Sequence, residues 1–88
     1  MRLELFGMAR HLVGTAALEV PVTSPVTVGR LLREAARAAP QLVGSVLEAD
    51  GTPIAPNYLL LDGRRAAEPG ATVRESDRPC LLVLASGG

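Results

Sequence analysis

The sequence has 88 residues, of which 48% are hydrophobic, and its nine cationic side chains, all Arg, balance nine acidic ones. This length suits one domain and not two, and the hydrophobic share favours a globular fold over disorder. With no net charge and only two aromatic residues, Phe6 and Tyr58, the chain lacks the basic patch and the stacking surface of nucleic-acid-binding proteins. No apolar run approaches the ~18 residues of a membrane span, and the N-terminal segment is unlike a signal peptide. The single cysteine, Cys80, excludes an internal disulfide, so we expect a protein of the reducing cytoplasm.

Two strands are predicted at the start of the chain. Residues 1–6 alternate strictly, which is typical of a half-buried strand: Met1, Leu3 and Leu5 on one face, and Arg2, Glu4 and Phe6 on the other. A loop at residues 7–14 follows, and then a shorter strand at 17–22. The two strands form a hairpin with a long connection.

A helix is predicted next, because apolar residues from Val28 to Ala39 recur at the spacing of one helical face. Thr27 or Ser24 can cap its start. Pro40 ends it, because proline excludes the preceding residue from helical geometry. Residues 41–47 can add one or two further turns, and residues 48–56 form a loop.

The second half of the chain predicts further strands. Residues 57–65 form a third strand with a turn signal at Asp62-Gly63, residues 66–79 are polar and rich in turn residues, and residues 80–85 form the last strand. A hairpin, one helix and further strands together predict an α+β fold, with a sheet covered on one face by the helix.

The later strands, "YLLL" and "LLVLA", are apolar on both faces, although only one long helix is available to cover the sheet. One apolar face is therefore left without an internal partner. Either this face is an interface for another protein, or residues 41–47 and the loops shield it. The sequence favours neither.

The sequence contains no arrangement typical of an enzyme's own catalytic machinery. His11 is a single histidine in a predicted loop, and Cys80 is expected to be a small buried side chain. No Cys/His spacing suits a metal, and the phosphate-binding glycine pattern is missing. We therefore predict no catalytic residue and no metal ligand.

The end of the sequence offers a different kind of chemistry. Gly87-Gly88 has no side-chain bulk and wide conformational freedom, so it can enter a narrow slot in extended form. A carboxylate there is a poor electrophile, and activation as an acyl-adenylate makes it reactive. Because the tail follows directly from a predicted strand, its base is anchored.

The whole chain resembles the ubiquitin-like sulfur carriers of the MoaD/ThiS family, which includes the small subunit of molybdopterin synthase. The resemblance rests on "LFGMARHLVG" after the first strand, "TVGRLLREAA" opening the helix, "NYLLLDGRR" in the third strand, and the terminal Gly87-Gly88. It implies a single β-grasp domain over residues 1–88 with a flexible C-terminal tail at 85–88.

The resemblance also implies a reaction cycle. An ATP-dependent activating enzyme adenylates the carboxylate of Gly88, and a sulfur donor enzyme converts it to a thiocarboxylate. The tail, with Ser86 and Gly87, then delivers the sulfur to a synthase subunit. On this reading the chain is a carrier and not an enzyme, it binds no cofactor of its own, and neither nucleic acid nor membrane is a partner. By position, its partner interface comprises Phe6, Arg10, Leu60 and Leu82, and Tyr58 shares this face by alternation.

Two departures from the family pattern leave the pathway open. The turn before the last strand is "ESDRP", and the approach to the tail is "LVLAS", where molybdopterin-type carriers have other residues. Molybdopterin synthesis is the pathway we favour, with thiazole, cysteine and specialised metabolites as alternatives. Two other classes stay open: a ubiquitin-like modifier joined to lysines of target proteins, and a ubiquitin-like interaction module with an idle tail.

Overall fold

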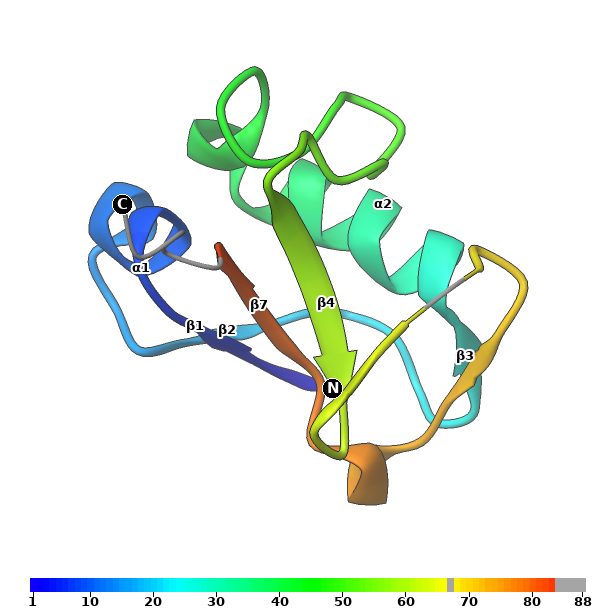
Figure 1. Cartoon of the computed structure of the whole chain (residues 1–88). Coiled ribbons are helices and arrows are strands. Elements are labelled where there is room, and N and C mark those ends of the chain that lie inside the picture. The colour runs from blue at the N-terminus through cyan, green and yellow to red at the C-terminus, as the bar shows by residue number, and fades with distance from the viewer. Residues whose placement is uncertain (67, 84–88) are drawn as a thin grey trace.

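The computed structural model describes residues 1–66 and 68–83. Its main sheet consists of five strands: β1 (Arg2–Leu5), β2 (Ala17–Glu19), β4 (Asn57–Leu61), β5 (Arg64–Arg65) and β7 (Cys80–Val83). They lie in the order β2-β1-β7-β4-β5, with β1 and β7 parallel and every other pair antiparallel (Figure 1). Helix α2 (Val28–Ala38) packs on one face of this sheet. The predicted α+β, β-grasp architecture is therefore confirmed.

The first strand follows its alternation. Met1, Leu3 and Leu5 are buried in the core, with exposed fractions of 6%, 0% and 0%. Leu5 lies opposite Leu81 in the register of β1 and β7, and both side chains join the same buried cluster as the apolar side of α2. Strict alternation thus assigned the buried side of this strand correctly.

The long helix also forms where it was predicted. The side chain of Thr27 caps it by accepting a hydrogen bond from the Arg30 amide at 3.2 Å. Ser24, the other capping candidate, instead accepts from the Glu75 amide at 3.3 Å. The helix ends at Ala38, and the segment after it adds a single 3₁₀ turn at Pro40–Leu42.

The predicted loop at 7–14 is wrong, because it contains a short helix, α1 (Met8–Val13). Ala9 is buried, and Leu12 and Val13 pack against the core. Gly14 ends the helix in a left-handed conformation at φ 87°. Six residues make less than two turns, so the apolar spacing was too short to show a helical period.

A small second sheet was also missed. Strands β3 (Val26–Thr27) and β6 (Thr72–Val73) pair antiparallel beside the start of α2 (Figure 1). Strand β6 lies in the stretch predicted to be rich in turn residues, and β3 lies where the start of the helix was expected. Each strand has only two residues, which is too few for a recognisable alternation. A 3₁₀ turn at Glu75–Asp77 follows β6. By contrast, the turn signal at Asp62-Gly63 is confirmed, since both residues have positive φ and connect β4 to β5.

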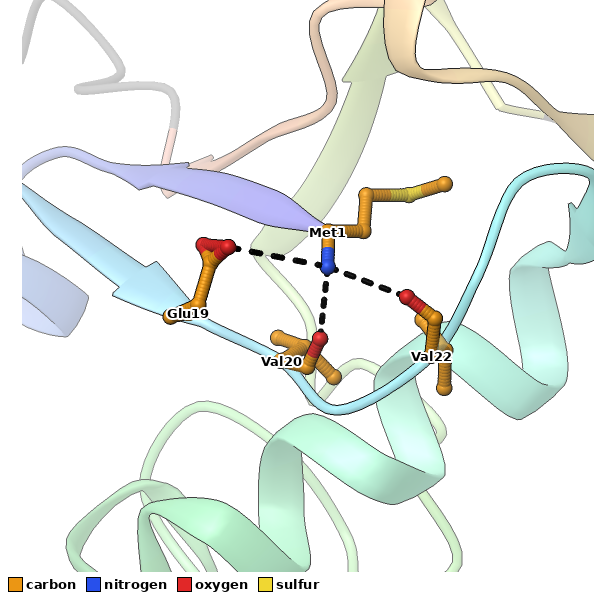
Figure 2. A network of polar contacts seen from close by, with 4 residues as sticks. All are labelled: Met1, Glu19, Val20 and Val22. Atoms are coloured by element: carbon orange, nitrogen blue, oxygen red, sulfur yellow. Dashed lines mark hydrogen bonds and ion pairs between the residues drawn. The ribbon is translucent and has the colours of Figure 1, made fainter.

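The second strand ends at Glu19 rather than residue 22, because the chain turns there to bind its own first residue. The amine of Met1 donates hydrogen bonds to the carbonyl oxygens of Val20 at 2.7 Å and Val22 at 3.0 Å (Figure 2). The Glu19 carboxylate lies 3.9 Å away. These contacts tie the start of β1 to the segment leading into β3 and α2.

Among the helices described, neither has the length and apolar character that crossing a lipid bilayer requires.

Candidate functional site

The residues examined for catalytic chemistry do not come together. His11 is exposed on α1, and Cys80 opens β7 on the opposite side of the sheet from α2. Burial raises the pKa of the Cys80 thiol, and the negative charge of Glu4 raises it further. Within residues 1–66 and 68–83, no group of three His, Cys, Asp or Glu side chains is placed to hold a metal ion. Cys80 is therefore largely a thiol at neutral pH, which is poorly suited to act as a nucleophile.

The sheet face turned away from α2 gathers the predicted interface residues. Tyr58 lies opposite Leu82, and Leu60 lies opposite Cys80 in the antiparallel register of β4 and β7. Directly paired residues point to the same side of a sheet, so these four side chains share one face. Phe6 extends β1 along β7, since its amide donates to the Leu81 carbonyl at 3.0 Å. We call this surface the outer face; it comprises Glu4, Phe6, Tyr58, Leu60, Arg65, Cys80 and Leu82.

The outer face is partly open to solvent. Phe6 is 48% exposed, and Tyr58, Leu60 and Leu82 are half-buried. Their inward-facing neighbours Leu5, Leu59 and Leu81 are 0–2% exposed, so the contrast follows the alternation of the strands.

The idea that residues 41–47 shield the outer face is wrong. Leu42, Val46 and Leu47 are fully buried, and they belong to the core cluster on the side of α2. The part of the chain that the structure describes therefore leaves the outer face without a covering helix.

One contact on the outer face was not predicted. The guanidinium carbon of Arg65 lies 4.7 Å from the centre of the Tyr58 ring, which is a cation–π contact. Arg65 reaches that position because β5 folds back beside β4 and places Arg65 opposite Leu60. The sequence contained the turn signal for this hairpin, but nothing in it marked which arginine would stack.

The remaining predicted residues lie elsewhere. Arg10 is exposed on α1 and belongs to none of the strands that form the outer face. Ser86, Gly87 and Gly88, together with the predicted flexible tail at 85–88, lie outside the described residues. The last described residue, Val83, is also the last residue of β7, the strand that contributes Leu82 to the outer face.

An open groove of about 740 Å³ lies between α2 and the β4–β5 hairpin. Its charged lining is mixed, with Arg30, Arg33 and Arg65 against Asp50 and Glu68. Thr27 and the carbonyl groups of Pro69 and Ala71 already accept hydrogen bonds from the first amides of α2, so the helix start offers no free donors to an anion.

The chain is similar to solved structures of small archaeal modifier protein 1 (SAMP1). A crystal structure of SAMP1 from Haloferax volcanii has a TM-score of 0.80 at 29% identity, over 99% of this chain and 97% of that one. A second crystal structure of the H. volcanii protein has a TM-score of 0.74 at 28% identity, over 93% of both chains. The solution structure of SAMP1 from Methanosarcina acetivorans has a TM-score of 0.75 at 20% identity, over 99% and 94%, and at that identity it shows the fold alone. No protein-family model matches the chain, and a search of curated proteins finds no match. The chain thus has the ubiquitin-like β-grasp fold of these small modifier proteins.

Proposed function

We propose that this chain is a ubiquitin-like sulfur carrier that works through the carboxylate of Gly88. The observation that carries the proposal is the partly exposed apolar surface of the outer face. It includes Leu82 of β7, the last described strand before Gly87-Gly88 in the chain. A carrier of this kind needs a surface for partner enzymes and a reactive end. It needs no catalytic group of its own. Similarity to proteins named small archaeal modifiers supports the same reading.

The chemistry begins with activation of the terminal carboxylate. A carboxylate oxygen of Gly88 attacks the α-phosphorus of ATP in the activating enzyme, and pyrophosphate leaves. A hydrosulfide then attacks the acyl carbon, and AMP leaves with the bonding electrons. Where an enzyme persulfide attacks instead, it forms an acyl disulfide, and a second thiol of the donor enzyme attacks the enzyme-side sulfur, which releases the thiocarboxylate and leaves a disulfide on the donor enzyme. The resulting Gly88 thiocarboxylate enters a synthase subunit and gives up its sulfur to a cofactor or metabolite precursor, with molybdopterin synthesis as the pathway we favour.

The outer face supplies the binding energy for these encounters. Phe6, Tyr58, Leu60 and Leu82 offer partly exposed apolar surface, whose removal from water contributes about 25 cal/mol per Å². Arg10 on α1 would add a charged contact at the edge of the docked partner. Ser86 and Gly87 have little side-chain bulk, so they would allow Gly88 to enter a narrow slot in a partner's active site.

Intact mass spectrometry tests the modification directly. The purified protein is first weighed to establish that Gly88 is its C-terminus. After incubation with ATP, its cognate activating enzyme and a sulfur donor, we expect the mass to rise by the exchange of one oxygen for one sulfur. Deletion of Gly88 should abolish this change while leaving the far-UV circular dichroism spectrum intact. An unchanged mass with a competent cognate enzyme would refute the proposal.

The outer face is tested with a matched pair of substitutions. Leu82→Asp places a charge in the middle of the outer face, and Val43→Asp places one on another exposed apolar side chain, 40% exposed, outside it. We expect Leu82→Asp to lose binding to the activating enzyme and Val43→Asp to keep it, with both variants folded. Equal binding by the two variants would show that the outer face is not the docking surface.

A second candidate is a modifier joined to lysines of target proteins, which similarity to proteins named small archaeal modifiers favours. Both functions use the same activated carboxylate and differ in the acceptor. Tryptic digestion separates them, because the Arg78–Pro79 bond resists trypsin and cleavage falls after Arg74. A modifier would leave residues 75–88 attached to target lysines, whereas a sulfur carrier would leave no such branch.

A further inference from the structure

Two opposite charges flank the apolar centre of the outer face. The cross-strand register aligns Glu4 on β1 with Cys80 on β7, Cys80 with Leu60 on β4, and Leu60 with Arg65 on β5. These four residues therefore form one row across the sheet, with an acid at one end and a base at the other. Among the described residues, neither Glu4 nor Arg65 takes part in an ion pair within the chain.

We infer that the outer face is self-complementary and that two copies of this chain pair through it as a face-to-face homodimer. The inference rests on the order of charges along the row and does not depend on the proposed function. A partner that fits this row must present a base over Glu4, apolar surface in the middle and an acid over Arg65. A second copy, turned by a two-fold axis parallel to the strands, presents that sequence of groups.

The position of the axis can be worked out from the strand order. Strands β1 and β5 are three spacings apart, or about 14 Å, so the axis that places Glu4 over Arg65 of a second copy lies midway, between β7 and β4. The same axis places Cys80 over Leu60 of the second copy. In the next row it places Leu82 over Tyr58 of the second copy, because those residues are also paired across β7 and β4. One operation thus matches both charges and both apolar pairs, at the ~10 Å separation of packed sheets.

The size of the outer face sets the strength of this association. Standard interfaces use roughly 20–30 residues per side, many more than the outer face offers, so we expect a reversible dimer with a Kd on the order of 0.1 mM. Because the same side chains form the proposed docking surface, a second copy and a partner enzyme would compete for it. Pairing would therefore protect the apolar face of the free carrier at high concentration.

Charge exchange tests the dimer in the unmodified protein, without ATP or any enzyme, so failure here is separate from failure of the proposed function. Sedimentation equilibrium from roughly 10 μM to 1 mM, with reductant to keep Cys80 a thiol, should show a monomer–dimer equilibrium. Glu4→Arg places two like charges at each of the two symmetric contacts, and so does Arg65→Glu. Each variant should dimerise at least about tenfold more weakly than the wild type.

The decisive measurement is a mixture of the two single variants. In a heterodimer of Glu4→Arg with Arg65→Glu, both contacts again join opposite charges, so the mixture should dimerise more tightly than either component alone. The double variant should regain self-association for the same reason. Far-UV circular dichroism checks the folding of each variant, and Glu4→Gln with Arg65→Gln replaces any variant that fails to fold, with weakening expected in place of repulsion. A wild type that stays monomeric at 1 mM, or a mixture that gains nothing over its components, would overturn the inference.

Discussion

Replacement of Gly51 by Ala probes the contact that fixes the loop after α2 against the helix itself. Gly51 is buried and has a φ of +93°. A Cβ atom there would lie 2.3 Å from the amide nitrogen of Arg33 and 2.6 Å from the carbonyl carbon of Leu32. Both atoms belong to the backbone of α2, so no side-chain rotation can relieve the overlap. Either the loop or the helix has to move.

Two costs add in Gly51→Ala. The left-handed backbone costs an alanine about 1–2 kcal/mol relative to glycine. Overpacking against a fixed neighbour costs typically a further 1–3 kcal/mol, and occasionally more. We therefore expect the free energy of unfolding to fall by about 2–5 kcal/mol, a large part of the ~5–10 kcal/mol that a domain of this size commonly has.

Gly44 is the matched control. Its φ is +91°, nearly the same as that of Gly51, but a Cβ atom built on it would meet nothing within 4 Å. Gly44→Ala therefore has the backbone cost without the overlap, and we expect a loss of about 1–2 kcal/mol. The gain from a stiffer unfolded chain is the same in both variants and cancels in the comparison.

Urea unfolding followed by circular dichroism measures the difference between the two variants. The free energy of unfolding should fall by at least about 1 kcal/mol more in Gly51→Ala than in Gly44→Ala, with similar m-values. Equal losses would show that the loop can move away from α2 at little cost. The close approach of Gly51 to α2 would then not fix the position of the loop that leads into β4.

Three further predictions follow from single contacts. Thr27→Ala removes the side-chain acceptor at the start of α2 and should cost about 1 kcal/mol in urea unfolding, whereas Thr27→Ser should cost much less. One residue added before Met1 converts the amine, which donates two hydrogen bonds, into an amide with a single N–H, so the free energy of unfolding should fall by about 1–3 kcal/mol. The exposed carboxylate of Glu19 lies 3.9 Å from this amine, and Glu19→Gln should change the stability little. The pKa of Cys80 is higher in the folded state than in the unfolded state. The protonated thiol therefore contributes its whole stabilisation at a pH below the pKa of the unfolded state, and this contribution is lost as the pH rises through the pKa of the folded state. The wild type should therefore lose more stability at alkaline pH than Cys80→Ala does, and an equal loss would contradict the assigned burial.

Most of the elements that the sequence predicted are long enough to show a period, although β2, with three residues, was predicted as well. The helix from Val28 to Ala38 covers about three turns, and its buried positions follow the 3.6-residue spacing. The alternation of residues 1–6 likewise separates buried Leu3 from exposed Phe6. Helix α1 and strands β3 and β6 are too short for their periods to repeat twice, so the sequence pattern does not reveal them, and their formation depends on tertiary contacts. Ala9 packs into the core, and Val26 lies opposite Val73.

The candidate site, too, could be predicted only in part from the sequence. The resemblance to the sulfur carriers named most of its apolar residues, and the strand pattern agrees with it, because strands that are apolar on both sides leave one face without a helix to cover it. The alignment of the two charges could not be predicted from the sequence, because Glu4 and Arg65 are 61 positions apart in the chain and align only through three successive strand pairings. A one-residue slip in any of those pairings would turn one of the two charges to the other face. The complementarity of the outer face is thus a property of the register, and substitutions that leave its composition unchanged but exchange its two charges are the ones that test it.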